Sequence, residues 1–295
     1  MPELPEVETV RRSLDASLRG RVISSGDVFW PRLLRNRSPY GLEGLTGKKI
    51  LRVRRRGKMI LVDCEEDCSL LFHLKMTGRI LICLQSLPRD KHTHFILRFK
   101  DRAQELRFHD VRKFGFVACL GGGGAYPVPE LAGLGPEPLE IGRDGFSALI
   151  GRRNGRLKSL LLNQKVIAGI GNIYADEILF RSRLHPETRP SALTKDDLRR
   201  LWRAMRSILR SAIERRGSSI RDYTDPDGEA GDFQRFHKVY GREGEPCRRC
   251  GKEIRRVRVG GRSTFFCPSC QRQKWGQATF RTSISHRSLE AGLKK

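Results

Sequence analysis

The sequence predicts an α+β protein with more than one domain: an antiparallel β-sandwich or barrel first, then a helical domain that carries a zinc-binding hairpin. Three observations favour this class. At 295 residues the chain exceeds the usual size of a single domain. Short strand-like runs fill the first 120 residues, whereas the apolar pattern later in the chain is helical. Four cysteines near the C-terminus have the spacing of a metal-binding hairpin.

An amphipathic helix is expected at the start of the chain, followed by strands. Apolar residues recur at helical spacing from residue 6 to residue 18, and Gly20 can end this helix. Strand-like runs separated by turn residues come next: 22–30, 50–54, 59–63, 70–74, 80–84, 93–99 and 114–120. Their number and their turns favour an antiparallel sandwich or barrel. The cysteines in or beside these runs are interpreted as buried or partly buried side chains without a metal: Cys64, Cys68, Cys83 and Cys119.

A segment rich in glycine and proline then interrupts both patterns and is expected to link two domains. Beyond it, Thr194 can cap the clearest amphipathic helix and Gly217 can end it. The last residues have little periodic apolar content. The predicted division is an N-terminal domain over 1–120, a linker over 121–142, a helical domain over 143–236, a zinc finger over 237–271 and a basic, disordered tail over 272–295.

Charge narrows the class of partner. The chain has 58 Lys and Arg residues against 33 Asp and Glu residues, a formal net charge of +25, and its isoelectric point is near 10.5. An excess this large predicts nucleic acid as the partner, with a membrane surface as the weaker competitor. No stretch approaches the ~20 apolar residues of a spanning helix, and acids stand where a signal peptide has basic and apolar residues. We therefore expect no membrane association and a cytoplasmic protein, bound to the nucleoid when it binds DNA, with reduced thiols.

The C-terminal cysteines predict one structural zinc ion per chain. Cys247, Cys250, Cys267 and Cys270 form two C-x2-C pairs separated by sixteen residues. Four thiolates close the zinc tetrahedron and leave no position for water, so the metal is expected to organise structure and not to catalyse. Basic residues alternate with apolar ones between the pairs, which predicts a two-stranded finger with a basic face. The alternative is a zinc ribbon that only stiffens the C-terminus. No redox or nucleotide cofactor is expected.

The first residues combine a candidate nucleophile with two acids. Removal of Met1 would leave the secondary amine of Pro2 as the N-terminus, and α-amino groups titrate near pH ~8, so a neutral fraction exists at neutral pH. Such an amine can attack a sugar carbon and form a Schiff base. Glu3 and Glu6 could donate a proton, accept one or fix the position of the amine. The same residues also suit a helix N-terminus, and both interpretations can hold together.

Residues Met1 to Glu8 resemble the opening of bacterial formamidopyrimidine-DNA glycosylases, the repair enzymes for oxidised purines. Leu4 favours this group over the related endonuclease VIII group, which has glycine at that place and acts on oxidised pyrimidines. Matching motifs continue in the same order to about residue 270. The resemblance implies an N-terminal β-sandwich with flanking helices, and a helical helix-two-turns-helix domain with the zinc-finger hairpin.

The resemblance also implies roles for interior residues. The segment 163–177 is similar to the helix-two-turns-helix motif of the family, in which the asparagine at Asn172 contacts the DNA backbone. Arg153 and Lys158 match positions that approach phosphates. Lys58 matches the family's strand lysine, which binds phosphate and assists β-elimination; an isolated lysine would be an ordinary surface residue.

Two loops resemble those whose side chains enter the duplex, through Met76, Arg112 and Phe114. Apolar wedges of this kind fill the space left by a flipped nucleotide. Without the resemblance, Met76 and Phe114 would be assigned to a core. His92 matches another DNA-contacting position, and Tyr240, in the connection into the zinc finger, is also expected to contact DNA.

The activity implied by the resemblance is that of a bifunctional DNA glycosylase and lyase, acting on 8-oxoguanine and formamidopyrimidines in double-stranded DNA as a monomer. Pro2 would attack the anomeric carbon of the flipped nucleotide, while Glu3 helps to protonate the sugar ring oxygen and Glu6 positions the amine. Successive β- and δ-eliminations would follow with help from Lys58 and Arg262. Two alternatives remain: an endonuclease VIII-like glycosylase for oxidised pyrimidines, and a non-catalytic zinc-finger protein that only binds nucleic acid.

Overall fold

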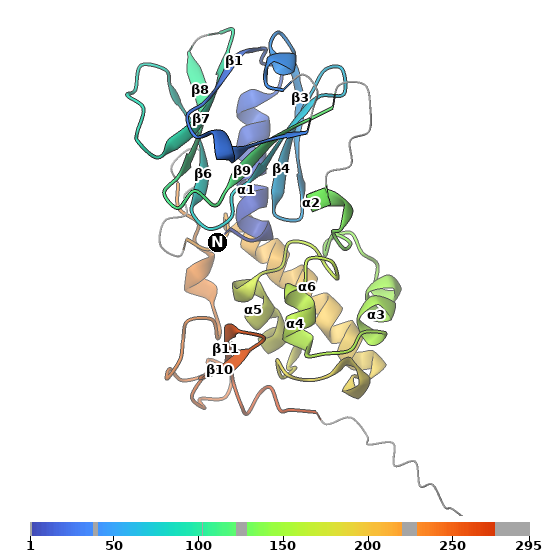
Figure 1. The fold of residues 1–295 in the computed structure, drawn as a ribbon. Coiled ribbons are helices and arrows are strands. Elements are labelled where there is room, and N and C mark those ends of the chain that lie inside the picture. The colour runs from blue at the N-terminus through green and yellow to red at the C-terminus, as the bar shows by residue number, and fades with distance from the viewer. Residues whose placement is uncertain (1, 38–40, 102, 122–128, 220–228, 275–295) are drawn as a thin grey trace, which may run out of the picture.

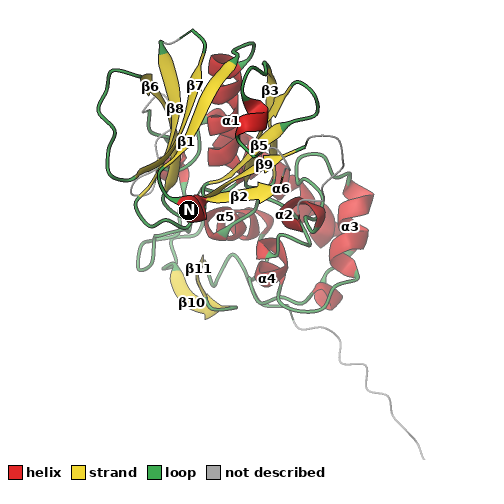
Figure 2. Cartoon of the chain, turned by 45° about the horizontal axis from the view of Figure 1, so that its top comes forward, coloured by secondary structure: helices red, strands yellow, loops and turns green. Residues whose placement is uncertain are grey.

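The computed structural model describes residues 2–37, 41–101, 103–121, 129–219 and 229–274. In Figures 1 and 2 two sheets lie at one end of the molecule, and most of the helices lie at the other end with a separate hairpin. This is the α+β arrangement that the sequence predicts. Most of the expected tail and part of the expected linker lie outside the described residues.

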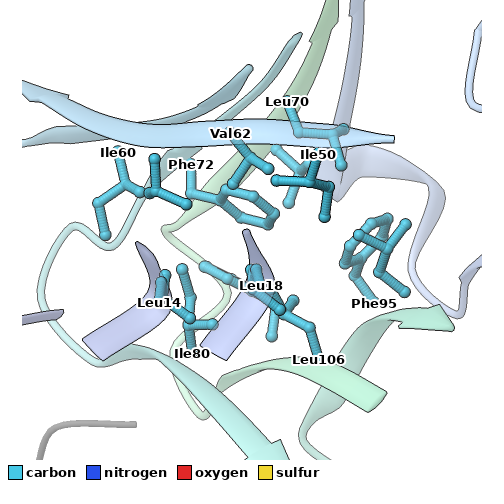
Figure 3. Close-up of a cluster of buried hydrophobic side chains, with 14 of the residues drawn as sticks. Leu14, Leu18, Ile50, Ile60, Val62, Leu70, Phe72, Ile80, Phe95 and Leu106 are labelled. Atoms are coloured by element: carbon cyan, nitrogen blue, oxygen red, sulfur yellow. The ribbon is translucent and has the colours of Figure 1, made fainter. Parts of the chain in front are cut away.

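Helix α1 (Leu4–Leu18) opens the chain as predicted, and its apolar face joins the core of the β-sandwich. Figure 3 shows Leu14 and Leu18 of this helix among side chains of both sheets, including Ile80 from one sheet and Phe72 from the other. All four side chains are almost completely buried. Burial of each apolar side chain of this size stabilises the fold by about 1.5–3 kcal/mol.

Two sheets face each other across this core. The first has the order β1-β7-β8-β6 and is antiparallel throughout; the second has the order β2-β9-β5-β4-β3. The strands are β1 (Ile23–Val28), β2 (Leu34–Arg37), β3 (Ile50–Arg56), β4 (Met59–Cys64), β5 (Ser69–His73), β6 (Gly78–Leu84), β7 (Thr93–Phe99), β8 (Gln104–Asp110) and β9 (Phe116–Leu120). Short 3-10 turns, η1 (Pro31–Leu33) and η2 (Glu43–Leu45), lie between the strands.

The sequence-based prediction of the sheets is wrong in three details. It missed β2, a short and polar strand, and it missed β8. In β8, Glu105 and Arg107 are buried because they form an ion pair with each other (Nε to Oε1, 2.6 Å), so a buried strand looks polar in the sequence. The pairing of β2 with β9 is parallel, whereas every other described pair in the sandwich is antiparallel.

The second half of the chain is helical, and a two-stranded hairpin follows it. Its elements are α2 (Pro129–Ala132), α3 (Arg143–Gly151), α4 (Leu157–Leu162), α5 (Asn172–Ser182), η3 (Pro190–Ala192), α6 (Lys195–Glu214), η4 (Phe233–Phe236), β10 (Arg255–Val259) and β11 (Arg262–Phe266). Thr194 caps α6 as predicted, since its hydroxyl accepts the N–H of Asp197 at 3.1 Å. Leu4 of α1 is buried in the core of these helices. The first turn of α1 therefore belongs to the helical core, and the rest of α1 to the sandwich core.

The cysteines of the sandwich behave as expected. Cys64, Cys68 and Cys119 are buried, and Cys83 is partly buried. Burial raises the pKa of Cys64 and of Cys119 to about 12, so these thiols stay protonated. No helix among the described residues is both long and apolar enough to cross a membrane.

Candidate active site and nucleic-acid interface

Glu3 joins the amino terminus to the helical domain. Pro2 and Glu3 are buried, and the Glu3 carboxylate accepts backbone N–H groups of Gly171 at 2.8 Å, Ile173 at 2.9 Å and Tyr174 at 3.3 Å. These groups are the free donors at the N-terminus of α5, where a negative charge is also favoured by the helix dipole. The carboxylate therefore has a fixed orientation directly beside Pro2.

Glu6 lies next to Glu3 and is fully enclosed. It accepts the hydroxyl of Tyr174 at 2.5 Å and the backbone N–H groups of Ser218 at 2.7 Å and of Glu3 at 2.8 Å. Burial raises the pKa of Glu6 to about 7, with a further rise from the charge of Glu3 and opposing hydrogen bonds from Tyr174, Ser218 and Glu3. At neutral pH Glu6 therefore exists in both protonation states, as a group that exchanges protons with an amine should.

A chain of hydrogen-bonding side chains, which no local sequence motif indicates, continues from Glu6. The hydroxyl of Tyr174 lies 3.3 Å from the hydroxyl of Ser218, which lies 3.0 Å from Nε2 of His237. Burial lowers the pKa of His237 to about 4, so its ring is neutral. These residues lie far apart in the sequence and match no local motif, so no sequence signal linked them to Glu6.

Lys58 lies at the turn between β3 and β4. Glu137 fixes this turn, because its carboxylate accepts the N–H of Gly57 at 2.6 Å and pairs with Arg55 at 2.7 Å and Arg56 at 2.9 Å. Gly57 has a φ of +58°, a conformation that glycine adopts without strain. Glu137 lies in the segment predicted as a linker, and no local sequence pattern indicates that it holds this turn.

The Lys58 side chain is nearly buried, and among the described residues it has no hydrogen bond or ion pair. Burial lowers its pKa; the carboxylates of Glu3 and Glu6 oppose this effect, and the charge of Arg262 adds to it. The charges of Glu3, Glu6 and Arg262 therefore lie within electrostatic range of Lys58. A lysine with a lowered pKa and no internal partner can bind a phosphate or accept a proton.

Arg262 is the first residue of β11 and is exposed. The β10–β11 turn before it consists of Gly260 and Gly261, with φ values of +54° and +77°, as a tight two-residue hairpin requires. Next to Arg262, the ammonium of Lys158 donates to the Ser263 carbonyl at 2.9 Å and to the Thr264 hydroxyl at 2.8 Å.

The structure corrects the expectation that Lys158 approaches a DNA phosphate. Its side chain is completely buried and pairs with Asp176, also completely buried, at 2.7 Å. Asp176 in turn accepts the N–H of Phe265 at 3.0 Å. The matching position in the family suggested DNA contact, but here the ammonium is used to hold the hairpin against α4 and α5. Lys158 is therefore a positioning residue for Arg262.

Asn172 and Tyr240 also contact the hairpin. The Asn172 side-chain amide donates to the Ser263 carbonyl at 3.0 Å, and its oxygen is buried without a hydrogen-bond partner among the described residues. The ring of Tyr240 lies 5.3 Å from that of Phe265. Both residues thus lie at the junction of α5 with the hairpin, and their contact with DNA remains a prediction.

Met76, Arg112 and Phe114 form one cluster at the surface. The guanidinium of Arg112 lies over the Phe114 ring at 4.6 Å and 3.3 Å from the Met76 sulfur. Met76 is 44% exposed and Phe114 is 50% exposed, which confirms that neither side chain is a core residue. The loop before Phe114 is held by the buried Asp110, whose carboxylate accepts the N–H groups of Arg112 at 3.2 Å and Phe114 at 2.8 Å and the hydroxyl of Thr77.

His92 and Arg153 are less tightly held. The N–H of His92 donates to Asp90 at 2.7 Å, and its ring, just before β7, lies 5.6 Å from that of His109 in β8. Arg153 is exposed just after α3. Neither contacts the carboxylates at the amino terminus in the described part of the chain, so both remain predicted DNA contacts.

The four predicted metal ligands come together. The sulfur atoms of Cys247, Cys250, Cys267 and Cys270 all lie within 4.8 Å of one another, the one such cluster found among the described residues. Two of the sulfur–sulfur distances are 3.5 Å and 4.0 Å. A tetrahedron with zinc–sulfur bonds of about 2.3 Å has edges of ~3.8 Å, so the site fits zinc. A small apolar cluster packs around it: Phe180, Val239 and Ile254.

Fold and site together define a class of protein. The β-sandwich and the helical domain meet at the two buried carboxylates that follow Pro2, and the charges of these carboxylates and of Arg262 on the zinc-finger hairpin act on the buried Lys58. These features are those of a zinc-finger DNA glycosylase.

Three family models match the chain. They are the formamidopyrimidine-DNA glycosylase N-terminal domain over residues 1–117, its helix-two-turns-helix domain over 134–224, and the zinc finger shared with isoleucyl-tRNA synthetase over 244–273. The chain belongs to the formamidopyrimidine-DNA glycosylase family. It is therefore an enzyme of the glycosylase and lyase kind, and the zinc finger holds one structural zinc ion.

Individual relatives agree over nearly the whole length. The formamidopyrimidine-DNA glycosylases of Pelotomaculum thermopropionicum and Solibacter usitatus are 44% and 47% identical, over 93% and 92% of this chain and 100% of each relative. A structure of a Lactococcus lactis variant bound to Fapy-dG-containing DNA has a TM-score of 0.84 at 37% identity, and the Thermus thermophilus protein has a TM-score of 0.82 at 42% identity. These structures cover 92% and 93% of this chain and 100% of their own.

Proposed function

We propose that this enzyme removes oxidised purines, including formamidopyrimidines, from duplex DNA and then cleaves the abasic site through a Schiff base on Pro2. The observation that carries the proposal is the position of Glu3 and Glu6. Both carboxylates are buried close to the amino terminus and accept backbone N–H groups of the helical domain. A protein that only binds DNA gains nothing from two buried carboxylates at this place, and their desolvation is unfavourable. The non-catalytic alternative is therefore not favoured.

The chemistry starts with the neutral amine of processed Pro2. Its electron pair forms a new bond to the anomeric carbon, while the electron pair of the broken glycosidic bond leaves with the base, which takes up a proton from water. Glu6, with a pKa near 7, accepts the proton from the amine. The proton taken from the amine then passes, with the help of Glu3, to the sugar ring oxygen as the ring C–O bond breaks and the iminium forms; Glu3 is held beside Pro2 by three N–H groups.

Strand cleavage follows from the same intermediate. Loss of a proton from the sugar carbon next to the iminium expels the 3′ phosphate, and a second elimination expels the 5′ phosphate. Lys58 can accept the proton lost in the first step, because it is desolvated and has no hydrogen-bond or ion-pair partner among the described residues. Arg262, held in place through Lys158 and Asp176, binds the departing phosphate.

The substrate class rests on the relatives. Those named above are formamidopyrimidine-DNA glycosylases, and solved relatives were bound to DNA containing Fapy-dG or an abasic site, which supports oxidised purines. One Lactococcus lactis complex holds DNA with an oxidised pyrimidine, so that lesion belongs in any substrate comparison. We further propose that the enzyme acts as a monomer on nucleoid DNA, with the catalytic, helical and zinc-finger units divided as predicted from the sequence.

The test is reductive trapping. Borohydride should link the processed protein to duplex DNA containing 8-oxoguanine, and the adduct should map to Pro2. A protein that retains Met1 should lose trapping, because its free amine is then on Met1, one residue further from Glu3 and Glu6 than the amine of processed Pro2. Pro5→Ala, a change in the same helical turn, serves as the matched control and should still trap. Trapping at the wild-type rate with Met1 retained would disprove the assignment.

A further inference from the structure

A cavity of about 650 Å³ lies on the helical domain, and neither Glu3 nor Glu6 lines it. Its walls come from α5, α6, η4 and the turn between the first two zinc ligands. None of the residues assigned to catalysis, DNA or zinc lines it. Phe180 in its wall is eight residues beyond Asn172, so at 1.5 Å per residue it lies about 12 Å along α5 from the helix end that binds Glu3. We call it the Arg–Phe pocket.

Four cations line the Arg–Phe pocket: Arg181, Lys238, Arg248 and Arg249. None of them pairs with a carboxylate among the described residues, whereas the buried arginines of the described chain, Arg107 and Arg242, each pair with a glutamate. The single acid in the wall, Glu177, is already used: its oxygens accept the N–H groups of residues 238–240 at 2.9–3.0 Å. The pocket therefore has an excess of positive charge that the protein itself does not neutralise.

The walls between these cations are apolar. Phe180 and Phe233 are nearly buried, and Phe236 is 39% exposed. Their rings already have stacking partners: Arg249 lies over Phe180 at 4.2 Å, Arg215 lies over Phe236 at 4.3 Å, and Phe233 and Phe236 stack on each other. A nucleobase binds best to a free ring face, so this arrangement favours carboxylates held by arginines beside an aliphatic or aromatic anchor.

We propose that the Arg–Phe pocket binds a short acidic segment of a partner protein, with an apolar side chain against Phe236. Its volume lies within the ~300–1,000 Å³ of pockets that enclose compact ligands, and its charge is complementary to Asp and Glu side chains. The C-terminal segment of this chain does not fit, because residues 272–295 contain six Lys and Arg residues and one Glu. The proposal does not depend on the reaction at Pro2.

The test measures binding of a fluorescein-labelled hexapeptide, four aspartates followed by leucine and phenylalanine, to the full-length protein. We expect saturable binding, absent for the same peptide with lysines in place of the aspartates. Arg181→Glu with Arg248→Glu should raise the Kd at least about tenfold, as should Phe236→Ala. Arg203→Glu with Arg210→Glu, exposed on α6 outside the pocket, is the matched control and should change the Kd less than about twofold.

Two further measurements keep the outcomes distinct. Zinc content and cleavage of abasic DNA should be normal in the Arg181→Glu, Arg248→Glu protein, which separates this pocket from the proposed catalytic function. Absence of saturable binding, or equal loss in the control variant, would overturn the proposal. It would also be overturned if a six-nucleotide oligothymidylate bound more tightly than the peptide and with the same dependence on Arg181 and Arg248, because the pocket would then be a nucleic-acid site.

Discussion

Glu6 combines a buried position near the proposed nucleophile with an unusual pKa. In the folded protein burial raises the pKa of Glu6 to about 7, whereas the ordinary value is 4.5. The folded pKa is the higher one, so its contribution to stability is complete below about pH 4.5 and is lost as the pH rises through about 7. A difference of this size corresponds to on the order of 3 kcal/mol.

This predicts a pH-dependent effect of Glu6→Gln, which keeps the shape but cannot ionise. Between pH 4.5 and pH 8 the free energy of unfolding of the variant should improve relative to wild type by on the order of 3 kcal/mol. Urea denaturation at several pH values measures it. Asp176, whose pKa burial also raises to about 7, titrates in both proteins and cancels in the comparison. Tyr174→Phe, which removes a hydrogen bond that lowers the pKa of Glu6, should move the transition to higher pH. A constant difference between the two proteins at all pH values would contradict the assignment.

Phe114 and Met76 allow a test of wedge against core. Both side chains are about half exposed, so Phe114→Ala and Met76→Ala should lower the melting temperature little, yet strongly slow single-turnover excision of 8-oxoguanine. Phe108→Ala is the matched control, since that ring is fully buried in β8 and its loss should cost ~3–5 kcal/mol. Normal excision by the Phe114→Ala and Met76→Ala proteins would remove the wedge from the mechanism.

At the scale of elements, the hairpin of β10 and β11 depends on zinc at one end and on Lys158 and Asp176 at the other. The metal ligands hold an apolar cluster that includes Val239 and Ile254, while the buried ion pair holds the strand that follows Arg262. Such a short hairpin has too little apolar surface to be stable alone. Both anchors are therefore expected to be needed to hold Arg262, the proposed phosphate ligand, in place.

Loss of zinc should uncouple this element from the rest of the molecule. Cys247→Ser should lower zinc content, weaken DNA binding and reduce the dependence of affinity on salt, because the cations of the finger are no longer held against the duplex. The β-sandwich should remain folded, since its core shares no residue with the zinc cluster. Cys119→Ser, at a buried cysteine of the sandwich, should retain zinc. Unchanged DNA affinity after loss of zinc would contradict this role of the finger.

At the scale of the whole molecule, the amino-terminal segment packs closely against the helical domain because the helical domain has glycines at the points of contact. A Cβ atom at Gly171 would lie 2.2 Å from the carboxylate carbon of Glu3, one at Gly217 would lie 2.6 Å from an oxygen of Glu6, and one at Gly169 would lie 2.7 Å from Leu4. Real atoms do not approach so closely. Glycines of the helical domain thus form the slots that hold the amino-terminal segment.

Gly171→Ala tests this fit. The φ of Gly171 is −129°, which alanine adopts freely, so the expected effect is steric: Glu3 must move, and excision and trapping should fall by about 100-fold or more. Gly142→Ala is the matched control, because Gly142 is also the N-cap of a helix but has nothing within 4 Å of the added Cβ. Equal activity of the two variants would show that the slot is not required.

The metal site and the candidate catalytic residues at the amino terminus could be predicted because their residues lie in short local motifs. The spacing of four cysteines identified the metal site, and the opening residues indicated Pro2, Glu3 and Glu6, whose catalytic roles remain predictions. The helical period located α1 and α6 to within a few residues. By contrast, β8 was missed because its buried charges pair with each other, and Lys158 was misassigned because its buried partner, Asp176, is eighteen residues away.

The sequence alone therefore determined the chemistry available: a basic chain with an amine and two acids at its start and a closed zinc site near its end. Only the tertiary structure decided how these groups behave. The pKa of Glu6 depends on its burial beside Tyr174 and Ser218. The position of Lys58 depends on a turn whose Gly57 N–H is bound by Glu137, eighty residues beyond Gly57. Burial and long-range contacts exist only when the domains have packed, and they set charge states that no local pattern encodes.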